Sequence, residues 1–245
     1  QLLQAEVVNH YHSYNFLSVY QKIHNFCVTE LGGFYLDVIK DRQYTTQVDS
    51  RARRSTQTAM LQVVEMLSRM IAPILSFTAD EIWQHIPGER ADSVFLSDFE
   101  EGHPALKESG EFDDAFWRRI LEVKTAVNRE LEVRRAEKTV GSGLSAEVDL
   151  FCDGQLADDL ARLGEELRFV LIVSRASVNS GTRAPEQAVA TEVAGLSLRV
   201  TASEHEKCER CWHHREDVGQ EAAHAGLCLR CVSNVAGDGE LRRFA

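Results

Sequence analysis

The segment Met60-Leu-Gln-Val-Val-Glu-Met-Leu-Ser-Arg-Met-Ile-Ala-Pro-Ile74 sets the fold class of the first hundred residues. Its apolar side chains recur three and four positions apart, which puts them on one face of an α-helix. Pro73 lacks a backbone N–H and clashes with the preceding turn, so we expect the helix to end or kink there. A run from Phe16 to Leu31 has the same spacing. The sequence therefore predicts a helix bundle over residues 1–100.

Signals for the next helix follow directly. Thr78 and Glu81 have the spacing of a capping box, just before an apolar pair, and predict a new helix start there. Pro87-Gly88 should end that helix. From Glu89 to Asp114 the sequence is an acidic connector with little periodicity.

A small α/β domain is predicted over residues 101–203. A charge-rich helix is expected from Phe116 to Lys138, and Gly141-Ser-Gly143 breaks it. The other elements expected are a half-buried strand at 148–152, a short helix at 156–167, a strand covered on both faces at 169–173 and a last strand at 196–200.

Composition excludes several classes of protein. The chain of 245 residues has 44% hydrophobic and 27% charged residues, which is ordinary for a globular protein, and no apolar run long enough to span a membrane. Its net charge of −11 argues against a uniformly basic nucleic-acid binder. Eleven acidic and two basic residues lie between Asp80 and Asp114, so basic faces elsewhere stay open. The chain opens at Gln1 without a secretory signal, and we expect a piece of something longer.

The cysteines predict a metal site. Cys208-Glu-Arg-Cys211 and Cys228-Leu-Arg-Cys231 are separated by sixteen residues, whereas Cys27 and Cys152 stand alone. Two such pairs complete a tetrahedron of thiolates, which suits one structural Zn²⁺ with no open position for catalytic water. Residues 204–245 are too few to build a core unaided, so metal binding would order them. The alternatives are two disulfides or a redox-active pair.

Aromatic and basic side chains around the finger give RNA-binding candidates. His205, His213, His214 and His224 are expected at the surface, because four cysteines already complete the site. Trp212 is either an exposed platform on which unpaired bases stack or a cover for the zinc knuckle. Two further basic stretches and the C-terminal tail complete the candidate RNA contacts, which are Arg51, Arg53, Arg54, Lys124, Arg129, Arg134, Arg135, Arg210, Trp212, Arg230, Arg242, Arg243 and Phe244.

Three longer motifs carry a resemblance to a known family. Gly33-Phe-Tyr-Leu-Asp-Val-Ile-Lys-Asp-Arg-Gln-Tyr-Thr45 and Met70-Ile-Ala-Pro-Ile-Leu-Ser-Phe-Thr-Ala-Asp-Glu-Ile-Trp83 closely resemble the anticodon-binding domain of bacterial isoleucyl-tRNA synthetases, which are class I enzymes. Cys208-Glu-Arg-Cys-Trp-His-His214, with Cys228-Leu-Arg-Cys-Val-Ser-Asn-Val-Ala-Gly-Asp-Gly-Glu240, is similar to the zinc finger of the same enzymes. Valyl and leucyl relatives normally end differently.

The resemblance implies a mainly α chain with three parts: a helix-bundle anticodon-binding domain (1–100), a connector with a small α/β domain (101–203) and a four-cysteine zinc-finger domain (204–245). It implies the tRNA(Ile)-recognition portion of an ATP-dependent ligase that charges isoleucine tRNA and edits valine. The His-x-Gly-His and Lys-Met-Ser-Lys-Ser signatures of the catalytic domain are not in this sequence, so the fragment has no catalytic residues and should be inactive alone. ATP would bind only the full-length enzyme.

Further expectations follow from the same resemblance. The partners would be the tRNA(Ile) anticodon stem-loop and the catalytic and editing domains of the same enzyme, with no membrane, in a cytoplasmic monomer. Two other classes stay open: a DNA-binding module of the formamidopyrimidine-DNA glycosylase type, which would need an N-terminal catalytic proline, and a structural adaptor that binds no nucleic acid. Selective DNA binding, or no RNA binding with zinc loaded, would favour these alternatives.

Overall fold

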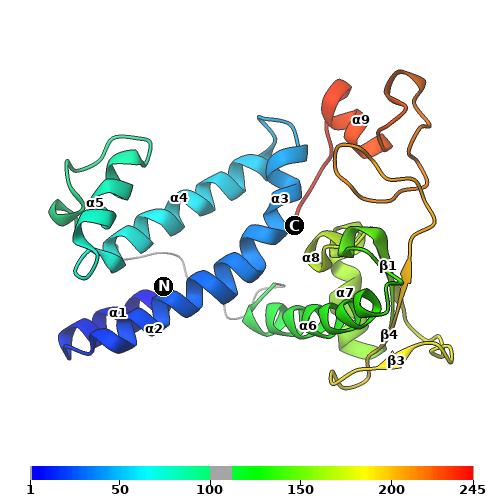
Figure 1. Cartoon of the computed structure of the whole chain (residues 1–245), viewed down its shortest axis with the longest axis horizontal. Coiled ribbons are helices and arrows are strands. Elements are labelled where there is room, and N and C mark those ends of the chain that lie inside the picture. The colour runs from blue at the N-terminus through cyan, green and yellow to red at the C-terminus, as the bar shows by residue number, and fades with distance from the viewer. Residues whose placement is uncertain (1, 100–111, 245) are drawn as a thin grey trace. The chain divides into compact units, whose positions relative to one another are not determined.

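The computed structural model describes residues 2–99 and 112–244, most of them helical (Figure 1). The chain divides into two units. Among the described residues, one unit holds 2–37 and 53–99, and the other holds 38–52 and 112–244. Within these ranges no helix is both long and apolar enough to cross a membrane. The predicted boundary at 100/101 and part of the acidic connector lie outside the described residues, and the three-part division of the chain stays a prediction.

All regular elements described in the first unit are helices. It contains α1 (Leu2–His12), α2 (Phe16–Asn25), the wider helical stretch η1 (Phe26–Tyr35), most of α4 (Arg51–Ile71), α5 (Ser76–His85) and the short helix η2 (Val94–Leu96). In Figure 1, α1 and α2 lie side by side. Val7, Val19, Ile23 and Met70 form one of its cores. The predicted helical fold of this region is confirmed.

Helix boundaries in this unit follow proline as expected. α4 ends at Ile71, two residues before Pro73, and α5 ends at His85, before Pro87. The predicted start of α5 at a Thr78 capping box is wrong, since the helix begins at Ser76. Ser76 Oγ donates to Ala72 O at 3.0 Å, so the chain turns directly from one helix into the next. Thr78 is therefore already helical.

The helical run from Phe16 changes its winding at Phe26, where η1 takes the wider π-type turn. Gly32 permits this winding, because a Cβ there would lie 2.9 Å from the backbone oxygen of Cys27, closer than a side chain tolerates. Periodicity alone cannot reveal such a change, since the chain stays helical on either side.

The second unit is a small mixed sheet with helices. Its elements are α6 (Asp114–Ala136), η3 (Gly143–Ser145), β1 (Ala146–Phe151), α7 (Gly154–Leu163), η4 (Gly164–Glu166), α8 (Leu167–Leu171), β2 (Arg175–Asn179), β3 (Val189–Ala190), β4 (Ser197–Ala202), η5 (Ala222–His224) and α9 (Leu229–Ala236). The strand order is β2-β1-β4-β3, with β1 parallel to β2 and antiparallel to β4. The chain from Val38 also belongs here, which includes most of α3 (Leu36–Thr45).

The apolar run at 169–173 is not the predicted strand. Residues 167–171 form the helix α8, and Ile172 ends it in the left-handed conformation at φ 59°. All five residues of α8 are buried, so the run is apolar on every face and its pattern cannot distinguish a helix from a covered strand. The following strand begins only at Arg175.

Strand β1 is buried along its whole length rather than on one face. A half-buried strand would put Glu147 and Asp149, which alternate with Val148 and Leu150, on the solvent side. Instead, Arg175 pairs with Glu147 at 2.7 Å, and Arg199 pairs with Asp149 at 2.7 Å. The arginine side chains therefore cover the polar face, and the half-buried prediction is wrong there.

Candidate metal centre

The four paired cysteines converge in the finger that follows β4. Their sulfur atoms all lie within 4.8 Å of one another, and each residue is at most 7% exposed. A tight turn forms the first knuckle, in which Trp212 N donates to Cys208 O at 2.9 Å. The second knuckle is the start of α9, where Cys228 N donates to Cys208 Sγ at 3.4 Å. Leu227 and Val218 pack against the cluster.

The donor set fits zinc. Zn–S bonds of about 2.3 Å in a tetrahedron require sulfur–sulfur separations of about 3.8 Å. Cys211 Sγ and Cys228 Sγ are 3.8 Å apart, and all four thiols are free of disulfides. Four buried cysteines without an open position define a structural site, as the spacing predicts.

The electrostatics of the four thiols also favour a bound cation. Hydrogen bonds from Cys208 and Cys228 lower the pKa of Cys211, whereas hydrogen bonds to Cys208 and Cys211 raise the pKa of Cys231. Sulfurs this close cannot all be thiolates unless a cation lies between them, because like charges disfavour ionisation. A divalent ion removes that conflict, since it favours the deprotonated form of every ligand.

The expectation that all four histidines lie at the surface is wrong for His213, which is 2% exposed. Its ring packs edge-on against Phe169 with centroids 5.5 Å apart, and Nδ1 lies 3.2 Å from Cys211 O. His213 is thus a core residue beside the knuckle and not a fifth ligand. His205 is exposed, while His214 and His224 are half-buried.

Trp212 is exposed, which supports the platform interpretation over the cover. The residue is 60% exposed, and its backbone adopts the left-handed region at φ 65°. The turn between the zinc ligands therefore holds the ring out from the knuckle.

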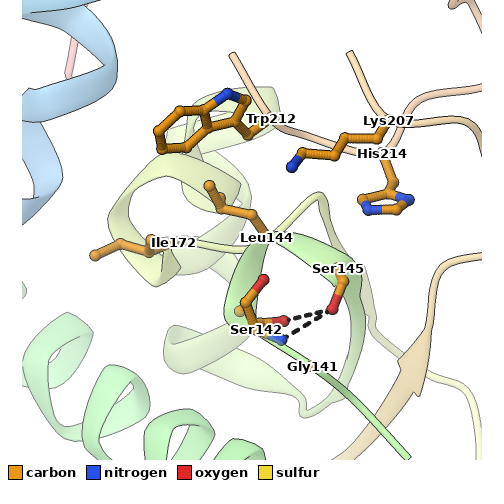
Figure 2. Close-up of a pocket in the computed structure, with 9 residues that line it drawn as sticks. Gly141, Ser142, Leu144, Ser145, Ile172, Lys207, Trp212 and His214 are labelled. Atoms are coloured by element: carbon orange, nitrogen blue, oxygen red, sulfur yellow. Dashed lines mark hydrogen bonds between the residues drawn. The ribbon is translucent and has the colours of Figure 1, made fainter. Parts of the chain in front are cut away.

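A pocket of about 500 Å³ opens beside this ring (Figure 2). Besides Trp212, its wall consists of Gly141, Ser142, Gly143, Leu144, Ser145, Ile172, Lys207 and His214. Lys207 Nζ lies 5.6 Å from the indole centroid. The sequence prediction missed Lys207, whose only signal was its position next to Cys208. The pocket therefore combines a flat aromatic wall, a cation and hydroxyl groups.

Two of the predicted RNA contacts, Lys124 and Arg242, are buried, and Arg230 is half-buried with little of its side chain exposed. Lys124 Nζ donates to Val170 O at 2.8 Å, and Arg230 and Arg242 pair with Asp41. Their exposed side-chain fractions argue against RNA contact, at 11% for Arg230 and 1% for Arg242. The residue Lys124 as a whole is 5% exposed. The RNA contacts predicted from charge alone thus include basic residues whose side chains bond within the protein instead.

Other candidates remain at the surface. Arg51 and Arg54 are exposed in the first turn of α4, and Arg53 is half-buried. On α6, Arg129 pairs with Glu192, Arg134 pairs with Glu130 and Glu137, and Arg135 pairs with Glu132.

The remaining candidates lie in the tail and in the first knuckle. Arg243 is exposed, whereas Phe244 packs on Phe112 with ring centroids 4.9 Å apart. Arg210 is half-buried against the end of α3.

The chain combines a helical unit with a second unit that holds a mixed sheet and a four-cysteine finger, and it therefore belongs to the class of zinc-finger proteins. Comparison with known sequences identifies the family within that class. The model for the anticodon-binding domain of tRNA ligase matches residues 1–150, and the model for the zinc finger found in FPG and IleRS matches residues 206–234. The chain belongs to the tRNA-ligase anticodon-binding family.

Three curated relatives illustrate the similarity. Proteins named isoleucine–tRNA ligase from Pseudomonas putida (strain W619), Pseudomonas fluorescens (strain Pf0-1) and Azotobacter vinelandii are each 57% identical over 244 residues, the full length of this chain. The chain spans about a quarter (26%) of the length of each relative.

Proposed function

We propose that this chain is the tRNA(Ile) anticodon-recognition portion of an isoleucine–tRNA ligase. The observation that carries the proposal is the pairing, in one chain, of an anticodon-binding match over 1–150 with a four-cysteine finger matched at 206–234. The finger model is also described for FPG, but the anticodon-binding match favours tRNA over DNA. The complete cytoplasmic enzyme would use ATP to join isoleucine to its tRNA, and this portion alone would be inactive.

The proposed role of this chain is to bind and position the tRNA, and it would make or break no covalent bond. Phosphate contacts orient a bound RNA, while unpaired bases are read by stacking and by hydrogen bonds. The Trp212 indole would accept an unstacked base in the pocket of Figure 2, with Lys207 near its phosphate. Zinc, when bound, would link the four thiolates and keep the Trp212 turn in place. Exposed arginines are the other proposed contacts: Arg51, Arg54, Arg129, Arg135 and Arg243.

Substitution of Trp212 tests this proposal. We expect Trp212→Ala to weaken binding of a tRNA(Ile) anticodon stem-loop by about 1–3 kcal/mol, the value of one base–aromatic stack. Trp212→Phe should keep most of the affinity, because its ring still offers a stacking face. Fluorescence anisotropy at fixed salt measures the change, and Val189→Ala serves as the control, since Val189 is an exposed apolar residue (40%) outside both the finger and the anticodon-binding match.

Equal affinities for the Trp212→Ala and wild-type chains would refute the stacking role. Wild-type affinity that does not change with salt would refute the phosphate contacts, because released counterions make RNA binding salt-dependent.

A further inference from the structure

Both arginines inside the zinc knuckles contact the C-terminal half of α3. Arg210, between the first two cysteines, donates from Nη1 to Thr45 O at 2.6 Å and from Nη2 to Tyr44 O at 3.4 Å. These carbonyls belong to the C-terminal turn of the helix, where a cation is favourable. Arg230, between the other two cysteines, reaches Asp41 one turn earlier. The finger is thus joined to α3 by both of its knuckles.

Asp41 is the centre of this joint. Its Oδ1 and Oδ2 accept from Nη1 and Nη2 of Arg230, both at 2.8 Å, which is the bidentate geometry of a strong carboxylate–guanidinium pair. Arg242 from the tail donates to Oδ1 as well. Burial raises the pKa of Asp41, but the charges of Arg230 and Arg242 outweigh it and hold the pKa below its usual value. Asp41 therefore stays ionised among its partners.

Neighbouring groups complete the joint. Glu240 accepts from Arg230 at 2.9 Å and from Asn234 at 2.8 Å, so it ties α9 to the tail. The Arg242 guanidinium lies 3.6 Å from the centroid of Phe169 in α8. Glu166 accepts from the backbone N–H groups of residues 243 and 244, both at 2.7 Å. Contacts from α3, α8, α9 and the tail thus meet around one carboxylate.

We propose that Asp41 is a positioning residue, which fixes the orientation of the zinc finger and of Trp212 by holding Arg230 and Arg242. It touches neither the metal ligands' sulfurs nor the pocket. Its effect on RNA passes through Arg230, which stands between Cys228 and Cys231. The part of this inference that concerns RNA rests on the proposed function, whereas the joint itself does not.

The test compares Asp41→Asn with Glu216→Gln, which removes the same charge from an exposed side chain of the finger. Zinc content, amide hydrogen exchange and affinity for the tRNA(Ile) stem-loop are measured on the full chain. We expect Asp41→Asn to keep one zinc per chain while exchange at 227–244 becomes about tenfold faster or more, because two largely solvent-shielded arginines lose a counter-ion. Exchange in β1 and β4 should not change, and RNA affinity should fall in parallel. Glu216→Gln should match the wild type.

Two further variants keep the proposal falsifiable if Asp41→Asn does not fold. Arg242→Lys keeps the charge but loses the planar fork, and should show the same local acceleration of exchange to a smaller degree. Asp41→Glu keeps the carboxylate and should restore part of the protection. Unchanged exchange at 227–244 in Arg242→Lys, or acceleration spread equally over β1 and β4, would overturn the proposal. Failure of the wild type to bind RNA would refute the proposed function and leave the exchange result to decide the joint.

Discussion

The four-cysteine cluster gives the first prediction at the scale of single residues. Replacing Cys231 by Ser should abolish stoichiometric zinc binding, because a hydroxyl is a poor substitute for a buried thiolate ligand. Zinc content after gel filtration measures the loss. Cys27→Ser is the matched control, since Cys27 is a free thiol outside the cluster. One zinc per chain in Cys231→Ser would contradict the assignment of ligands.

Tyr11 gives a prediction about pH. Burial raises the pKa of its phenol to about 12, and its hydroxyl donates to Met70 O at 2.7 Å. A raised folded-state pKa means that stability is complete below the ordinary pKa of about 10 and falls as pH rises from there through about 12. Tyr11→Phe should cost about 1 kcal/mol at pH 7, the net value of one hydrogen bond.

Urea denaturation at pH 7 and pH 11 measures both effects. The difference in unfolding free energy between the wild type and Tyr11→Phe should shrink at the higher pH, because the phenol ionises in the unfolded chain while burial keeps it protonated in the folded one. A difference that is equal at both values would show that Tyr11 titrates normally.

At the scale of elements, the turn before β1 depends on a glycine. A Cβ at Gly143 would lie 2.5 Å from Ile172 O, a backbone atom that cannot move aside. Gly143→Ala should therefore destabilise the second unit by about 1–3 kcal/mol, as overpacking does elsewhere. Gly141→Ala is the internal control, because its Cβ meets nothing nearer than Ser145 Oγ at 3.8 Å. Equal urea midpoints for the two variants would contradict this packing.

Elements with a strong local signal could be predicted from the sequence. The apolar period of α4, its end before Pro73 and the helix from Phe116 to Lys138 follow from spacing and proline chemistry. The short α8 could not be predicted, because a segment buried on every side shows no period. The buried polar face of β1 depends on arginines about 30 and 50 residues away in the sequence, which no local pattern reveals.

The residues of the candidate site also fall into two groups, those that local sequence predicts and those that it does not. The four ligands follow from their spacing alone, since Cys-x-x-Cys geometry is local. Which basic residues face solvent does not follow from local sequence, because Arg230 and Arg242 are held away from solvent by ion pairs with Asp41, about two hundred positions earlier in the chain. The exposure of Trp212 depends on a positive φ in the knuckle, which its residue type disfavours.

At the scale of the whole molecule, zinc should order one part of the chain and not the rest. Chelation should remove amide protection from residues 206–236, which have few apolar contacts beyond the cysteine cluster, and leave β1 and β4 protected. Hydrogen exchange with and without a chelator measures this. Loss of protection throughout β1 and β4 would contradict a role for zinc confined to the finger.

The most direct test of the central claim is a binding measurement with the zinc-loaded chain. Fluorescence anisotropy would compare anticodon stem-loops of tRNA(Ile) and tRNA(Val), before and after chelation. We predict tighter binding of the isoleucine stem-loop, a steep loss of affinity with salt and loss of that preference once zinc is removed. Equal binding of both stem-loops by the zinc-loaded chain, or no binding of either, would contradict anticodon recognition by this chain.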